Sequence, residues 1–227
     1  MKSKQFIAMA GNIGTGKTTA AEIIAEHFGC EMFREPVVDN RFLAPYYKNM
    51  GRWSFTLQME FLLKRLEHHT QIERATSACV QDRSLIEDPE IFAKYLHGLG
   101  NMTDDELALY YDYFQRMNEE ARQPDKLILL HTPDVSVLLR RIAQRGRAEE
   151  SGITTSFLRG LNNYYENFAE VARAKYDLDV EVIDITKLDI RRGPGRQDFV
   201  ERVGAFLAKD SKSAGQLPFY KGKKNEQ

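Results

Sequence analysis

The fold of this chain is decided by residues 11–18, which read Gly11-Asn-Ile-Gly-Thr-Gly-Lys-Thr18. The stretch fits the pattern G-x-x-x-x-G-K-[ST], in which glycines turn the backbone so that successive N–H groups point into one concavity. In that pattern the lysine reaches the β- and γ-phosphates of a nucleotide and the next hydroxyl serves Mg²⁺. The sequence therefore predicts an ATP-binding phosphate loop made of Gly11, Asn12, Ile13, Gly14, Thr15, Gly16, Lys17, Thr18 and Thr19.

The segments on either side of the loop have the patterns that such a loop requires. Residues 5–10 form a short apolar run of strand type, and residues 19–27 have helical periodicity. A helix that begins at the loop adds a favourable field for phosphate. Four more short apolar segments predict buried strands, with helical patterns between them, at 30–34, 77–82, 126–131 and 179–184. This alternation predicts an α/β fold with a five-stranded parallel sheet flanked by helices.

The remaining helices and the domain limits follow from periodicity and breakers. Helices are expected at 53–75, 103–122, 154–176 and 196–208. The third residue after Thr103 is Glu106, which is typical of a capping box at a helix start. Gly193-Pro-Gly195 is expected to break the chain before the last helix. We expect one domain over 1–208 and a polar, flexible C-terminal tail over 209–227.

Composition excludes several classes of partner. The net charge is −1, with 42% apolar and 29% charged residues, so bulk charge gives no case for binding nucleic acid or membranes. No apolar run approaches the ~20 residues of a membrane helix. The two cysteines lack metal-ligand spacing, and the N-terminal residues leave no room for a secretory signal. We expect a cytoplasmic protein.

Charged residues follow two of the predicted strands, at the sheet edge where ligands bind in open parallel sheets. Asp82-Arg-Ser84 ends the third strand, where Asp82 could hold Mg²⁺ opposite Thr18 and Arg83 could contact the transferring phosphoryl group. Glu35 ends the second strand and could orient an acceptor hydroxyl and accept its proton. These residues predict phosphoryl transfer rather than nucleotide binding alone.

An arginine-rich segment supports the same chemistry. Four arginines lie within eight residues, with Gly146 as a hinge, at positions 140, 141, 145 and 147. Guanidinium groups match the equatorial oxygens of a transferring phosphoryl group. The segment is predicted to close over the phosphates as a lid.

Taken together, these motifs resemble those of the deoxynucleoside kinase family, in particular its bacterial deoxyadenosine/deoxyguanosine branch. The match runs to about residue 207 and includes the loop at 11–18, Glu35-Pro-Val37, Trp53-Ser-Phe-Thr-Leu-Gln58, Asp82-Arg-Ser84 and Arg145-Gly-Arg147-x-Glu-Glu150. The resemblance implies a kinase that phosphorylates the 5′-hydroxyl of a deoxynucleoside with ATP and Mg²⁺, in nucleotide salvage. It also implies a homodimer, for which the Tyr-rich helix at 103–122 is a candidate surface.

The resemblance also implies residue roles at the reacting groups. Glu35 looks like the base that activates the 5′-hydroxyl, and Arg83 like its partner at the 5′-oxygen. Lys17 looks like the phosphate-loop lysine, and Asp82 takes the position of the metal-associated carboxylate. The lid arginines correspond to Arg141, Arg145 and Arg147.

Further positions match those that hold the nucleoside and the donor base. Tyr47 and Glu150 fall where relatives hold the sugar 3′-hydroxyl. Gln58 falls where an amide bonds the base edge, and Phe92 where a ring stacks on the base. Relatives that prefer purines or cytosine have a polar pair that corresponds to Arg65 and Asp88. Asp189 closes a stretch, 184–189, that resembles the loop packing on the donor adenine.

Two departures and two alternatives accompany this interpretation. Leu57 stands where many relatives carry Phe, and Phe61 would narrow the base pocket. A thymidylate-type nucleoside monophosphate kinase shares the loop, the sheet and an Arg-Glu-Pro stretch, although Val37 and Ser84 favour a deoxynucleoside kinase. A non-catalytic kinase-like subunit is the second alternative, against which the presence of every predicted catalytic residue argues.

Overall fold

The computed structural model describes residues 4–35, 40–147, 150 and 152–209. Pro36 and Val37 of the second strand-end motif lie outside these residues. The predicted flexible tail also lies outside them, apart from its first residue, Lys209.

Five parallel strands form one sheet, as the sequence predicts. They are β1 (Phe6–Ala10), β2 (Glu31–Phe33), β3 (Cys79–Gln81), β4 (Lys126–His131) and β5 (Val180–Asp184). Their order in the sheet is β2-β3-β1-β4-β5. Because β1 is central, the phosphate loop that follows it leaves the middle of the sheet's carboxyl edge, next to the ends of β3 and β4.

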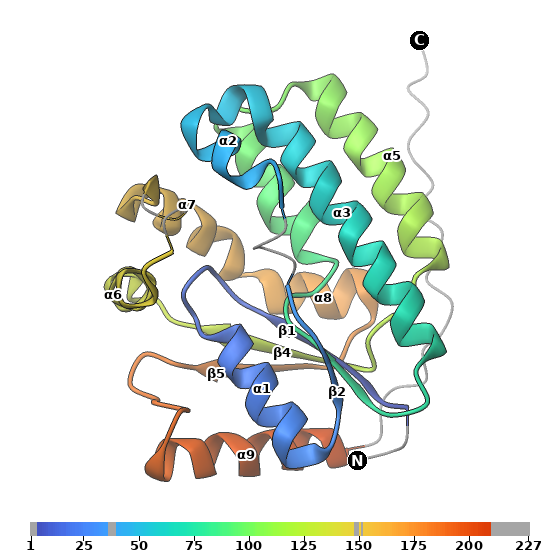
Figure 1. Cartoon of the computed structure of the whole chain (residues 1–227), viewed down its shortest axis with the longest axis vertical. Coiled ribbons are helices and arrows are strands. Elements are labelled where there is room, and N and C mark those ends of the chain that lie inside the picture. Colours follow the sequence, from blue (N-terminus) through green and yellow to red (C-terminus); the bar gives the residue numbers. More distant parts are fainter. Residues whose placement is uncertain (1–3, 36–39, 148–149, 151, 210–227) are drawn as a thin grey trace.

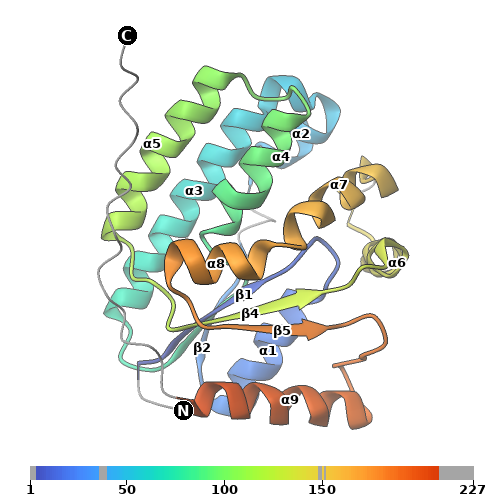
Figure 2. The same cartoon turned by 180° about the vertical axis from the view of Figure 1, so that it is seen from behind.

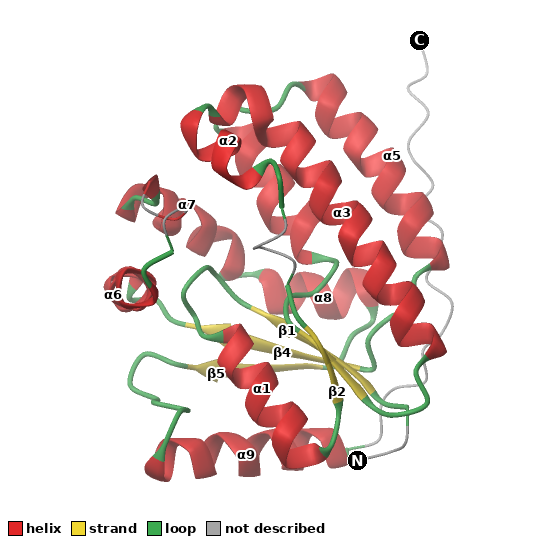
Figure 3. Ribbon diagram, viewed as in Figure 1, coloured by secondary structure: helices red, strands yellow, loops and turns green. Residues whose placement is uncertain are grey.

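Helices cover both faces of this sheet. They are α1 (Lys17–Phe28), α2 (Leu43–Lys48), α3 (Met50–Arg74), the π-helix η1 (Asp88–Ala93), α4 (Lys94–Gly98), α5 (Asp104–Glu120), α6 (Val135–Arg145), α7 (Thr155–Tyr165), α8 (Phe168–Tyr176) and α9 (Gly193–Ala208). Helices α1 and α9 lie on one side of the sheet, and α3, α5 and α8 lie on the other (Figure 1). The layered arrangement, with the strands between two sets of helices, is plain in Figure 3.

The hydrophobic core has two main parts, one on each face of the sheet. In β1, Ile7 and Met9 pack in the cluster that contains α1 and α9, whereas Ala8 and Ala10 pack in the cluster that contains α3 and α8. This alternation follows from the two-residue period of a strand. Both faces are therefore buried, which explains why the strands read as continuous apolar runs.

The helix predicted at 154–176 is in fact two helices, so that prediction was wrong. Helix α7 ends at Tyr165 and α8 begins at Phe168. The break falls at Asn167, whose φ of −105° and ψ of 3° depart from helical values. Asparagine is a poor helix former because its side chain competes for backbone hydrogen bonds.

The last helix begins earlier than the sequence predicts. Helix α9 starts at Gly193, and Pro194 lies in its first turn instead of breaking the chain before it. Proline is accepted there because the first N–H groups of a helix have no partner within the helix.

The predicted capping box is present at the start of helix α5, which lies at an outer edge of the molecule. Thr103 accepts from the Glu106 backbone, and the Glu106 side chain accepts from the Thr103 backbone. Tyr110 and Phe114 are buried, while Leu109 and Tyr113 are exposed. Figure 2 shows α3, α4 and α5 from the opposite side. Over the part of the chain that the structure describes, no helix has both the length and the apolar character to cross a membrane.

Candidate active site

The phosphate loop has the backbone that its glycines permit. Gly11 has φ of 144°, and a Cβ there would lie 2.5 Å from the carbonyl oxygen of Leu130 in β4. Gly16 has φ of 95°, in the left-handed region, and directly precedes α1. Side chains at either position would strain the turn. The loop therefore places the N-terminus of α1 at the sheet edge, where it favours an anion.

Lys17 is buried within this loop. Its Nζ donates to the carbonyl oxygens of Gly11 at 2.7 Å and Asn12 at 3.2 Å. Burial lowers the pKa of Lys17, although the negative charges of Glu87 and Glu35 oppose that shift. The lysine thus lies among acidic groups that favour its charged form.

Thr18 and Asp82 meet, as the sequence predicts. The Thr18 hydroxyl donates to Asp82 Oδ2 at 2.6 Å, and the buried Asp82 Oδ1 accepts no hydrogen bond from the described residues. Burial and the charge of Glu35 raise the pKa of Asp82. A cation would counter both effects, and a hydroxyl with a carboxylate suits Mg²⁺, which takes few protein ligands and keeps waters or phosphates. The described residues hold no cluster of three or more His, Cys, Asp or Glu side chains suited to a metal.

Glu35 and Arg83 form a tight ion pair. Arg83 Nη1 lies 2.6 Å from Glu35 Oε1, and both side chains are largely buried. Burial raises the pKa of Glu35, but the charges of Arg83, Lys17 and Arg65 lower it by more, so that the pKa is about 2. Arg83 also has a positive φ of 82°, which is rare outside glycine. The turn after β3 thus aims a strained arginine at the carboxylate after β2.

Arg65 of α3 and Asp88 of η1 form a second pair directly behind the first. Arg65 Nε and Nη2 donate to the two oxygens of Asp88 at 2.5 and 2.8 Å, and each side chain is 1% exposed. Arg65 lies 3.9 Å from Glu35, and Asp88 lies 3.9 Å from Arg83. The predicted polar pair is therefore formed, but it supports Glu35 and Arg83 and is not part of the pocket wall.

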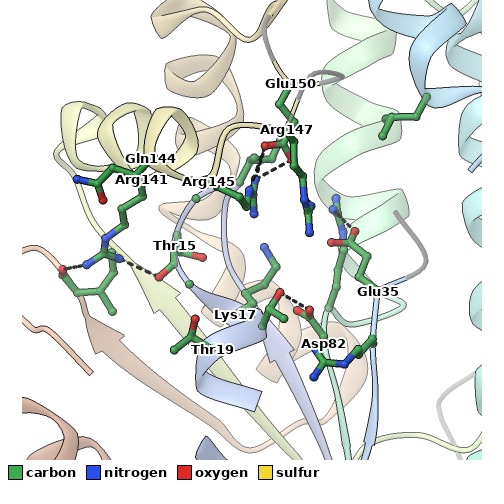
Figure 4. Close-up of a pocket in the computed structure, with 18 of the residues that line it drawn as sticks. Thr15, Lys17, Thr19, Glu35, Asp82, Arg141, Gln144, Arg145, Arg147 and Glu150 are labelled. Atoms are coloured by element: carbon green, nitrogen blue, oxygen red, sulfur yellow. Dashed lines mark hydrogen bonds and ion pairs between the residues drawn. The ribbon is translucent and has the colours of Figure 1, made fainter. Parts of the chain in front are cut away.

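One pocket of about 630 Å³ joins these groups. Its wall includes Gly14 to Thr19 of the loop and α1, together with Glu35, Asp82 and Arg83 (Figure 4). The wall also includes the predicted nucleoside-binding residues Tyr47, Gln58, Phe92 and Glu150. Gln58 Oε1 is buried without a hydrogen-bond partner among the described residues. An unsatisfied amide oxygen on a pocket wall can accept from a ligand.

Two predicted loop residues lie behind the wall instead. Gly11 and Asn12 do not line the pocket. The Asn12 amide donates to Leu158 O at 3.0 Å and Asn162 Oδ1 at 3.2 Å, which ties the loop to α7. Ile13 and Thr15 do line the pocket.

The arginines of α6 approach the loop from the side opposite to Glu35 and Asp82 (Figure 4). Arg141 donates to Thr15 O at 3.0 Å and to Ile185 O at 3.3 Å, so it bridges the loop and the segment after β5. Arg145 and Arg147 both pair with Glu150, at 2.5 and 3.4 Å. The lid prediction also involves residues 148 and 149, which lie outside the described residues, and it stays a prediction.

Asp189 lies on the pocket wall beside Arg191. Arg191 donates to both Asp189 oxygens, at 2.8 and 3.0 Å. These hydrogen bonds lower the pKa of Asp189 to about 2.

Sequence reasoning missed several residues of this region, among them Gln144, Arg191 and Glu87. Gln144 and Arg191 line the pocket, and neither belongs to a motif that would mark it. Glu87 is fully buried beside the loop and accepts from Ser84 N at 2.8 Å and Ser84 Oγ at 2.9 Å. The spacing of Ser84 and Glu87 is that of a capping box, a signal that could have identified this contact.

Comparisons with known proteins show which family this chain belongs to. The family model for deoxynucleoside kinases matches residues 7–208. The Bacillus subtilis (strain 168) deoxyadenosine/deoxycytidine kinase is 36% identical over 165 residues, which cover 72% of this chain and 76% of that enzyme. The deoxyguanosine kinase of the same strain is 31% identical over 209 residues, which cover 91% and 98%.

A solved structure of deoxyadenosine kinase from M. mycoides, with bound dATP, superimposes with a TM-score of 0.77. It is 30% identical, and the match covers 90% of this chain and all of that one. The chain therefore belongs to the deoxynucleoside kinase family.

Proposed function

We propose that this chain transfers the γ-phosphoryl group of ATP to the 5′-hydroxyl of a deoxynucleoside, with a preference for deoxyadenosine or deoxyguanosine. The observation that carries the proposal is one pocket that contains both the phosphate loop and the Glu35–Arg83 pair, 2.6 Å apart. A carboxylate beside an arginine suits an acceptor hydroxyl, which must be oriented and must lose a proton.

Glu35 would act mainly by orientation. With a pKa of about 2, its carboxylate is ionised at neutral pH and accepts a hydrogen bond readily, but it is a weak base. Phosphoryl transfer has a loose transition state, in which the hydroxyl proton is lost late and positioning matters more than basicity. Arg83 would hold Glu35 in place and face the developing charge on the acceptor oxygen.

The donor side would be held by the phosphate loop and by the arginines of α6 and the segment that follows it. The N–H groups of the loop and Lys17 would bind the phosphates, and Arg145 and Arg147 would exchange their contacts with Glu150 for phosphate oxygens. Thr18 and Asp82 would hold Mg²⁺, which when bound supplies neutralising charge for the donor phosphates. Arg141 and Asp189 would border the donor nucleoside.

Base preference would arise at Gln58 and Phe92 on the pocket wall. Gln58 offers an amide oxygen with no partner among the described residues, and Phe92 offers an apolar ring. A site of this kind rejects a base that leaves its polar groups unpaired. The buried Arg65–Asp88 pair is not on the pocket wall, so it would support Glu35 and Arg83 and would not contact the base. Tyr47 and Glu150 would bond the sugar.

The rival activity is phosphorylation of a nucleoside monophosphate such as dTMP. An acceptor phosphate would meet the negative charge of Glu35, which opposes its binding. Turnover should therefore be measured with ATP, Mg²⁺ and deoxyadenosine, deoxyguanosine, deoxycytidine, thymidine or dTMP in separate reactions. Turnover of a purine deoxynucleoside supports the proposal. Turnover of dTMP alone overturns it, and no turnover at all favours a non-catalytic subunit.

We further propose a homodimer built on α5, whose exposed Leu109 and Tyr113 lie one helical turn apart. Large apolar side chains exposed close together can mark a protein interface. Nucleotide salvage is the pathway proposed for this reaction. The cytoplasmic location stays a prediction from the sequence.

A further inference from the structure

Glu87 has a carboxylate whose hydrogen-bonding capacity is fully used, although the side chain is 0% exposed. Oε1 accepts from Gly11 N at 2.9 Å and from Tyr165 OH at 2.7 Å. Oε2 accepts from Ser84 N at 2.8 Å and from Ser84 Oγ at 2.9 Å. A carboxylate offers about four lone-pair sites, so each one has a donor.

The four donors come from three separate parts of the chain. Gly11 begins the phosphate loop, Ser84 follows the strained Arg83, and Tyr165 ends α7. Gly11 is 76 residues from Glu87 and Tyr165 is 78 residues from it. One side chain therefore joins the donor half of the pocket to the turn that presents Arg83 to the acceptor half.

The contact with Gly11 is important because this residue is tightly constrained. Its φ of 144° and its approach to Leu130 O leave the loop little freedom on the β4 side. Its N–H group points to Glu87 and not into the pocket, so it is not available for phosphate. The contact with Ser84 similarly fixes the residue directly after Arg83, and Arg83 itself has a left-handed backbone with φ of 82°.

We propose that Glu87 is a positioning residue for phosphoryl transfer. Its carboxylate fixes the position of the phosphate loop relative to the turn that carries Arg83. This inference rests on the proposed function for its catalytic part. Its effect on the loop can be measured by nucleotide binding alone.

The main test is Glu87→Gln, compared with Glu90→Gln. Glutamine has only one acceptor oxygen. Its NH2 group would therefore face two of the four donors, and either the Gly11 side or the Ser84 side would lose its acceptor. Glu90 is a matched control because it is also buried. It accepts from Lys94, Lys175 and Tyr176, away from the loop.

The affinity for ATP is measured by calorimetry without acceptor, and kcat and both KM values are then measured with deoxyadenosine. In Glu87→Gln we expect ATP affinity and kcat to fall about tenfold or more each, with the acceptor KM nearly unchanged. Glu90→Gln should lower the unfolding midpoint and leave ATP affinity at the wild-type value. Wild-type ATP affinity in a folded Glu87→Gln protein would overturn the proposal.

Two milder variants keep the proposal testable if Glu87→Gln does not fold. Tyr165→Phe and Ser84→Ala each remove one donor and leave the carboxylate in place. Each should weaken ATP binding about threefold, because one net hydrogen bond is lost from the same carboxylate. ATP affinities equal to wild type in both variants would contradict the proposal. If the wild type bound ATP but used no deoxynucleoside, the proposed function would fail and the binding test would still stand.

Discussion

At the scale of single residues, the site depends on a carboxylate whose charge is fixed by its neighbours. Arg83, Lys17 and Arg65 together outweigh the cost of burying Glu35. We expect Glu35→Gln to lower kcat about 100-fold or more and to change the KM for the deoxynucleoside only slightly, because the neutral amide keeps the shape but loses the ion pair with Arg83 and is a weaker acceptor for orienting the 5′-hydroxyl. Steady-state kinetics with deoxyadenosine measure both values. An unchanged kcat would remove Glu35 from the reaction.

The same charge predicts how stability depends on pH. The pKa of Glu35 is about 2 in the folded protein, against about 4.3 in an unfolded chain. A lowered pKa stabilises the fold above the unfolded value, and this contribution is lost as the pH falls toward the folded value. The free energy of unfolding of wild type minus that of Glu35→Gln should therefore shrink from about pH 6 to pH 3. Urea denaturation at several pH values measures it, and a constant difference would contradict the assignment.

At the scale of elements, the Arg65–Asp88 pair connects α3 to η1 behind the reacting groups. Removing one partner leaves an uncompensated buried charge, so Asp88→Asn should lower the free energy of unfolding by about 3 kcal/mol. The exposed pair Arg202–Glu181 provides the control, since Glu181→Gln should cost less than about 1 kcal/mol. Chemical denaturation measures both, and equal losses would show that the buried pair has no special role.

The elements also show what could be predicted from the sequence. The loop at 11–18, the five strands and the capping box at Thr103 were predictable because each depends on local pattern. The division at Asn167 was missed because the helical periodicity on its two sides is continuous. The roles of Glu87 and Asn12 were missed for another reason: their partners lie far along the chain, and only the sheet order brings them together.

At the scale of the whole molecule, α5 predicts the oligomeric state. Leu109 and Tyr113 are 45% and 46% exposed, and their burial would be expected in a homodimer. Light scattering should give a dimer mass for wild type and a monomer mass for the double variant Leu109→Glu, Tyr113→Glu. Arg196→Glu on α9, which covers the other face of the sheet, should remain dimeric. A monomeric wild type would contradict this prediction.

The central claim is that the whole pocket transfers phosphate from ATP to a 5′-hydroxyl. The most direct measurement is ³¹P NMR of the products formed from ATP, Mg²⁺ and deoxyadenosine, with Glu35→Gln as the comparison. We predict ADP and deoxyadenosine 5′-monophosphate in equal amounts with wild type, and a much slower rate with the variant. ADP with inorganic phosphate alone, or equal rates for the two proteins, would contradict the claim.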